Sequence, residues 1–198
     1  RTTRVVTGSQ VAMSANGKTL AWLVTNAAEG SYTLQMAPTL GTDKPATLRT
    51  GRLRINAPAV SPDGTRVAYE YMTNTDWEIY LSDASGAHTR VTRDIQHDIL
   101  PRFLTDTTLL GMMGEPRHRR SQVYDLTAGT RTRVFANNTV RTISPEYIWL
   151  PSADGTRLLL SAERDGDTVS VERGVYLVDL ARTVSVADLQ ARVDRQLA

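Results

Sequence analysis

The chain has 198 residues, a net charge of +2 and no cysteine, which excludes disulfide bonds, thiolate metal ligands and a cysteine nucleophile. Hydrophobic residues make up 40% and charged residues 22% of it, the balance of an ordinary globular domain. No stretch reaches the roughly 18 consecutive apolar residues that a transmembrane helix needs, so the sequence predicts no membrane-spanning helix.

A short phrase recurs along the chain. It consists of an apolar run, a serine, one further residue, Asp or Asn, a glycine and then a strand-like stretch, and its turn positions lie 47, 43 and 48 residues apart. A period of about 40 to 50 residues with several short strands per unit is typical of β-propeller blades. The copies are MSANGKTLAW at 13–22, VSPDGTRVAY at 60–69, the degenerate FLTDTTLL at 103–110, and PSADGTRLLL at 151–160.

Each copy belongs to a series of short strands that are rich in β-formers and separated by turn residues. The fullest unit predicts four antiparallel strands, at 55–60, 65–71, 77–81 and 89–93. The expected fold class is therefore all-β, a β-propeller of about four four-stranded antiparallel blades. The equivalent strands are expected at 18–24, 32–37 and 47–49, at 108–113, 122–126 and 131–135, and at 156–162 and 174–180.

The pattern changes after residue 180. A capping-box-like pair opens the last segment, and apolar residues then follow at spacings of 3, 4 and 4, which places them on one helical face. We therefore expect two parts, propeller blades over 1–183 and an amphipathic helix over 184–198. The residues are Ser185 and Asp188 for the cap, and Val186, Leu189, Val193 and Leu197 for the apolar face.

The second unit resembles the TolB-type propeller repeat. The resemblance lies in PAVSPDGTRVAY at 58–69, EIYLSD at 78–83 and the connecting DILPRF at 98–103, and it extends over about residues 5–180. Thr107 replaces the turn glycine in the third unit. Such repeats usually come in sixes or sevens, so we expect either a piece of a larger propeller or a ring completed by other segments. The start at Arg1 without a signal-peptide pattern also predicts a processed protein or part of a longer one.

The resemblance implies two alternative functions. TolB-type propellers bind partners in the bacterial periplasm through loops and the central channel, which predicts a non-catalytic module that binds another protein or a larger assembly in the cell envelope. Similar repeats form the gating domain of prolyl-oligopeptidase-like serine peptidases. The alternative is therefore an accessory propeller of a secreted hydrolase, a peptidase, whose catalytic domain is not in this chain.

Motifs for catalysis and cofactor binding are missing from the sequence. No Gly-x-Ser-x-Gly nucleophile elbow occurs, and the three histidines, His88, His97 and His118, lack metal-ligand spacing. No phosphate-binding glycine loop is present. We therefore expect no enzyme activity in this chain, no metal, no cofactor and no nucleic-acid partner.

Two short basic or polar segments are the candidate partner-binding residues. Arg117, His118, Arg119 and Arg120 form a dense basic cluster, which is also what a solvated hairpin tip would show. His97 and Asp98 stand before a blade, where an imidazole could meet a ligand; alternatively, Asp98 caps the following turn and His97 is only exposed. The variable loops at 74–77, 115–121 and 165–173 are the expected contact elements.

Overall fold

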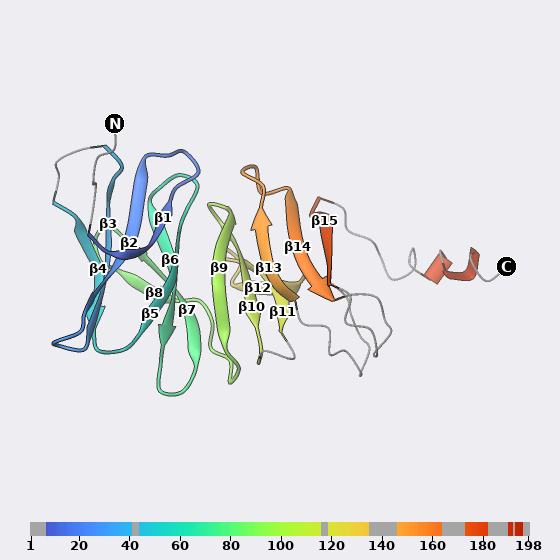
Figure 1. Cartoon of the computed structure of the whole chain (residues 1–198). Coiled ribbons are helices and arrows are strands. Elements are labelled where there is room, and N and C mark those ends of the chain that lie inside the picture. The colour runs from blue at the N-terminus through green and yellow to red at the C-terminus, as the bar shows by residue number, and fades with distance from the viewer. Residues whose placement is uncertain are drawn as a thin grey trace.

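The computed structural model describes residues 7–40, 44–115, 119–134, 146–163, 173–181, 190–191 and 193–195. These residues form four antiparallel sheets that stand side by side (Figure 1). In each sheet the spatial order of the strands is their order in the chain. The first sheet holds β1 (Ser9–Met13), β2 (Thr19–Asn26), β3 (Ser31–Pro38) and β4 (Ala46–Gly51), and the second β5 (Ile55–Val60), β6 (Arg66–Met72), β7 (Trp77–Asp83) and β8 (His88–Arg90). The third holds β9 (Asp98–Thr105), β10 (Thr108–Met113), β11 (Arg120–Asp125) and β12 (Thr130–Arg133), and the fourth β13 (Glu146–Pro151), β14 (Arg157–Glu163) and β15 (Arg173–Asp179).

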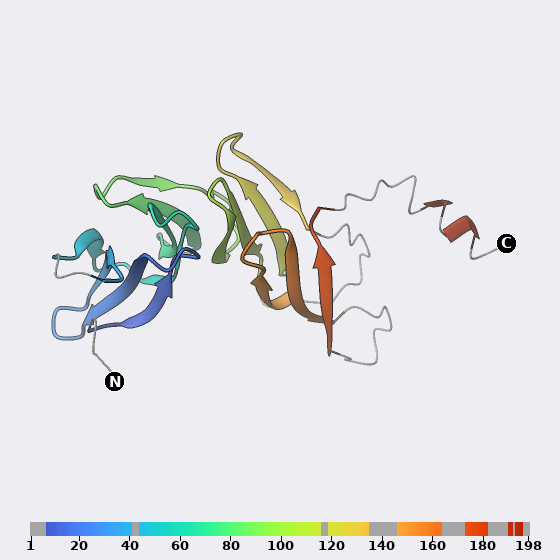
Figure 2. The ribbon, with the colours of Figure 1, turned by 90° about the horizontal axis from the view of Figure 1, so that it is seen from above.

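The sheets stack face to face in chain order, as Figure 2 shows from above. Their first strands meet on the inside, because β1 contacts β5, β5 contacts β9 and β9 contacts β13. This arrangement of meandering sheets is that of β-propeller blades, which confirms the expected fold class. The fourth blade has three strands in the described part of the chain, whereas the others have four.

The repeated serine phrase forms the turn between the first two strands of a blade. In the second blade the Ser61 hydroxyl donates to Asp63 Oδ1 (2.6 Å) and accepts the Arg66 amide (3.0 Å), while the Thr65 amide donates to the same Asp63 oxygen (2.9 Å). The serine and the acid therefore satisfy the backbone of a tight turn together. The same pattern holds Ser14 to Asn16 (2.7 Å) and Ser152 to Asp154 (2.5 Å).

Each junction between blades is closed by apolar side chains from both sheets. Between the first and second blades, Ala21, Met36 and other residues of the first sheet pack on Val60 and Val67 of the second. The two following junctions have the same construction. Burial of this kind contributes about 25 cal/mol per Å² of apolar surface, so each blade depends on its neighbour for stability.

The predicted C-terminal helix lies partly within the described residues. Residues 190–191 and 193–195 are helical and exposed, and Val193 retains 47% of its accessible surface. Ser185, Val186, Asp188, Leu189 and Leu197, which carry the rest of that prediction, lie outside the described residues. The start of the helix and what covers its apolar face stay predictions.

The turn glycines provide a test of blade packing. Gly17 and Gly155 have similar positive φ values of 71° and 68°, but a Cβ on Gly17 would meet nothing within 4 Å, whereas one on Gly155 would lie 2.0 Å from the Leu104 carbonyl oxygen of the preceding blade. We expect Gly17→Ala to lower the free energy of unfolding by about 1–2 kcal/mol through backbone strain alone. Gly155→Ala should cost about 1–3 kcal/mol more through overpacking.

Urea unfolding of the two variants measures this difference. Equal losses would show that the turn of the fourth blade does not pack on the third as described.

Candidate functional site

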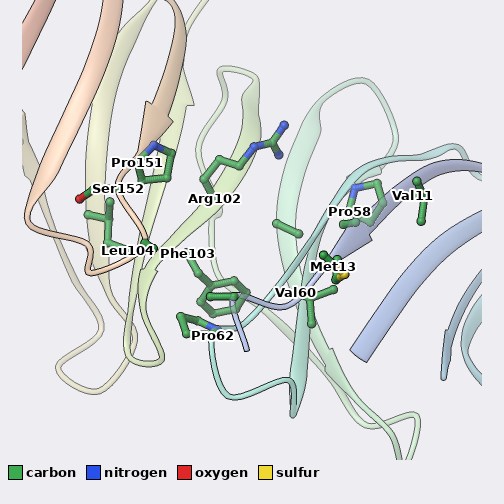
Figure 3. A pocket seen from close by; sticks show the side chains of 14 residues that line it. Val11, Met13, Pro58, Val60, Pro62, Arg102, Phe103, Leu104, Pro151 and Ser152 are labelled. Carbon is green, nitrogen blue, oxygen red and sulfur yellow. The ribbon is translucent and has the colours of Figure 1, made fainter. Parts of the chain in front are cut away.

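A pocket of about 360 Å³ opens where the inner strands of all four blades meet. We call it the axial pocket; it is lined by β1, β5, β9 and β13 and by the serine turns that follow β1, β5 and β13 (Figure 3). Most of the residues that line it have apolar side chains, among them Val11 and Met13, which are 64% and 58% exposed. Of the described residues that line it, Arg102 alone carries a charge. A concave apolar site with one placed charge is typical of a ligand pocket.

Arg102 reaches the pocket from the middle of β9 (Figure 3). Its guanidinium donates to the Pro101 carbonyl oxygen (2.8 Å), and no carboxylate among the described residues forms a salt bridge with it. Burial lowers the pKa of Arg102, and the charge of Glu70 opposes this. A partly desolvated guanidinium in apolar surroundings attracts a carboxylate more strongly than one in water does.

Backbone bulges shape the wall beside Arg102. Gln10, Ala57 and Leu100 have positive φ values (49°, 45° and 53°) at a register shift in β1, β5 and β9 respectively. Each of the last two residues donates its amide to a side chain of the preceding blade, Ala57 to Gln10 Oε1 (2.8 Å) and Leu100 to Glu70 Oε1 (2.7 Å). These bulges turn the inner strands at the pocket.

Glu70, in β6 of the second blade, accepts the Leu100 amide at the bulge in β9. It is buried, with 4% of its surface exposed. Burial raises the pKa of Glu70, and the hydrogen bond from the Leu100 amide together with the charge of Arg102 opposes the rise. Glu70 therefore links the bulge of the third blade to the second blade.

A loop face lies between the second and third blades at the start of β9, whereas the pocket is lined by the end of that strand. We define it by the β6–β7 loop at 73–76, the end of the connection to β9 at His97, and the start of the β10–β11 loop at 114–115. His97 Nδ1 accepts the Trp77 amide (3.2 Å), and the imidazole lies 3.8 Å from Asp76 Oδ1 and 3.7 Å from Glu115 Oε1. The structure thus brings together His97 and two of the loops that the sequence predicted as contact elements.

The basic cluster is only partly described. Arg119 and Arg120 are half-buried, and Arg120 begins β11 and donates to the Arg119 carbonyl oxygen (2.8 Å). Arg117 and His118 lie outside the described residues, as does the loop at 165–172. Their part in partner binding stays a prediction.

Asp98 is placed differently from the turn-cap interpretation. It begins β9, is fully buried, and its Oδ1 accepts the Tyr124 hydroxyl across the sheet (2.6 Å). Interpreting Asp98 as a cap and His97 as merely exposed is wrong, because both side chains contact other strands or loops. Asp98 supports the loop face from within and does not lie on its surface.

Arg102 and Glu70 are the site residues that the sequence analysis missed. Arg102 pairs with Leu110 of the neighbouring strand. The equivalent positions of the second and fourth blades hold Ala59 and Leu150, which pair with Ala68 and Leu159. An arginine in an otherwise apolar column is a signal that comparison of the inner strands could have found. No comparable signal marks Glu70.

Comparison with solved structures identifies the fold. The structure is similar to TolB from Acinetobacter baumannii (20% identity, 89% of this chain and 42% of that one, TM-score 0.67) and to a Mycobacterium tuberculosis puromycin-hydrolyzing peptidase (20%, 90% and 29%, 0.65). It is also similar to the β-propeller domain of the Trilobed protease from Pyrococcus furiosus (14%, 91% and 58%, 0.62). The chain thus spans between 29% and 58% of the length of these structures. No family model and no curated protein matches the sequence.

The fold and its neighbours define the chain as a β-propeller protein. Within that class its fold is TolB-like. No described helix is long and apolar enough to cross a membrane. Within the described ranges no three His, Asp or Glu side chains gather closely enough to hold a metal ion.

Asp98 makes stability depend on pH. Burial raises its pKa to about 6, against the hydrogen bond from Tyr124, whereas an unfolded aspartate titrates near about 3.9. The folded state therefore binds the proton more tightly. The free energy of unfolding should fall, on the order of 2–3 kcal/mol, as pH rises from about 4 to about 6.

Urea unfolding across this range should show the fall in the wild type and a smaller fall in Asp98→Asn, in which Glu70 still has a pKa raised by burial. Tyr124→Phe, which removes the donor to the carboxylate, should extend the fall to higher pH. An Asp98→Asn protein with an unchanged pH dependence would contradict the assignment.

Proposed function

We propose that this chain is a non-catalytic propeller module that binds another protein at the axial pocket and at the loop face. The observation that carries the proposal is the pocket itself, a hollow at the junction of four inner strands that is lined mainly by residues with apolar side chains and has Arg102 in its wall. An apolar surface with one cation suits a protein segment that presents an apolar side chain next to a carboxylate.

The loop face would extend this contact beyond the pocket. His97, with Asp76 and Glu115 beside it, adds polar groups on loops held by rigid strands, where binding residues concentrate. Arg117, His118 and Arg119 belong to the β10–β11 connection and Arg120 begins β11; all four are proposed as further contacts. Asp98 would act by holding β9 in place.

The proposed setting is the bacterial cell envelope, either the periplasm or outside the cell. The TolB-like fold supports this proposal. The partner is proposed to be a protein or a larger assembly, which could itself be associated with a membrane. We propose neither a cofactor nor a nucleic-acid partner.

A second candidate is the propeller segment of a secreted peptidase. It is favoured by the similarity to the puromycin-hydrolyzing peptidase and to the Trilobed protease propeller, of which this chain covers 29% and 58%. In that case catalysis would reside in another domain, and the axial pocket would face or filter its substrate. The two candidate functions share the propeller fold; they differ in whether the propeller is joined to a catalytic domain.

Photo-crosslinking from the pocket tests the binding proposal. With benzoylphenylalanine at Met13, which lines the pocket, we expect one discrete protein adduct in the native source. Arg102→Glu in the same protein should reduce its yield about tenfold, because it places a carboxylate where the partner presents one.

Ile95 is the matched control position, since it is apolar, 92% exposed and away from the pocket. The same adducts from Met13 and Ile95, or an adduct that Arg102→Glu leaves unchanged, would contradict the proposal.

A fluorophosphonate probe separates the two candidates. It labels the activated serine of serine hydrolases, whereas the hydroxyls of Ser61 and Ser152 are donors to turn carboxylates. We expect the native protein to stay unlabelled. Labelling of the native polypeptide would favour the peptidase and overturn the assignment of a non-catalytic module.

A further inference from the structure

A second hollow, of about 400 Å³, opens between the outer strands of the second and third blades. We call it the outer groove. It is lined by residues 89–94, at and after β8, by residues 124–126 and 129–131, around the turn from β11 to β12, and by Leu81 of β7. No described residue lines both this groove and the axial pocket, so a site here does not rest on the function proposed above.

The floor of the outer groove is apolar. Leu81 and Tyr124 are buried, and Val91 and Leu126 are half-buried and pack on the same cluster. Thr130, on the third blade, is exposed. An occupant of the groove can therefore bury an apolar side chain against Val91 and Leu126.

The charged side chains of the groove leave one guanidinium without an ion pair. Of the two acids, Asp94 accepts Arg131, and Asp125 Oδ1 accepts two backbone amides of its own turn (2.9 Å each). Of the other two arginines, Arg90 pairs with a buried glutamate (2.6 Å). Arg93 is exposed, and no described carboxylate forms a salt bridge with it. The uncompensated charge is therefore positive and complements an acidic occupant.

The edge of the third blade adds main-chain groups to the groove. β12 is the outermost strand of its sheet, and the Val134 amide donates to the Ser121 carbonyl oxygen of β11 (3.0 Å). Antiparallel residue pairs alternate between hydrogen-bonded and non-hydrogen-bonded, so the register directs the amide and carbonyl of Arg131 away from β11. An extended chain can pair with such outward groups as an added strand.

We propose that the outer groove binds an extended, acidic segment of a protein partner. The segment adds to the edge of β12, places an apolar side chain against Val91 and Leu126, and presents a carboxylate to Arg93. A small anion would use the guanidinium alone and leave the apolar floor and the strand edge without a role. The three features together therefore favour a peptide.

Fluorescence anisotropy with a labelled peptide tests the proposal on the 198-residue chain. The probe is the peptide Glu-Val-Glu-Leu-Glu-Val-Glu, and the charge control has lysine in place of each glutamate. We expect the acidic peptide to bind at least about tenfold more tightly than the basic one. Equal binding of the two, or no binding of the acidic peptide at about 1 mM, would overturn the proposal.

A pair of charge-reversal variants locates the site. Arg93→Glu should weaken binding of the acidic peptide about tenfold, because it replaces the free guanidinium with a carboxylate. Arg52→Glu makes the same change of charge at an exposed position outside the groove, and at physiological salt it should alter the affinity by less than about twofold. Both side chains are exposed, so both variants should keep their circular dichroism spectra. Equal losses would show a general attraction to a basic protein and overturn the assignment of the groove.

Methylation of the peptide backbone tests the added strand. Methylating the amides of either the odd-numbered or the even-numbered residues blocks hydrogen bonding along one edge of an extended chain. One of the two methylated peptides should lose binding and the other should keep it. Equal binding of both, whether kept or lost, would contradict pairing with β12.

Discussion

The fold depends on one repeated contact, in which an apolar row on one face of each blade packs against the next blade in the chain. A single three- or four-stranded sheet cannot bury enough surface to be stable alone. The rows of Ala21 with Met36, of Ala59 with Leu81, and of Leu110 with Met112 each become core only when the following blade covers them. Stability is therefore shared between neighbours.

This packing also creates the candidate site. Because successive blades stack face to face with their first strands in contact, these strands converge, and the space between them is the axial pocket. At the bulges, Ala57 and Leu100 have positive φ values, which residues other than glycine rarely adopt. Hydrogen bonds from their amides to side chains of the preceding blade stabilise these conformations. The pocket wall is thus set by contacts between blades, which also place Arg102 in it.

Local features of the fold could be predicted from the sequence, and contacts between blades could not. The serine turn, its period and strands such as the one expected at 65–71, found at Arg66–Met72, follow from neighbouring residues. The bond from Tyr124 to Asp98 spans 26 residues and the bond from Leu100 to Glu70 spans 30. The DILPRF segment at 98–103 contains one partner of each bond, but nothing in the sequence indicates the distant partner. The grouping of His97 with Asp76 and Glu115 likewise depends on how two blades are packed.

Hydrogen–deuterium exchange on the protein, free and bound to the partner recovered from its native source, would test the central claim that the axial pocket is the binding site. The account predicts new protection in the segments that line the pocket, at 11–15, 58–62, 102–104 and 151–153. Protection confined to the blade perimeter, such as β8 and β12, with the inner segments unchanged, would contradict it.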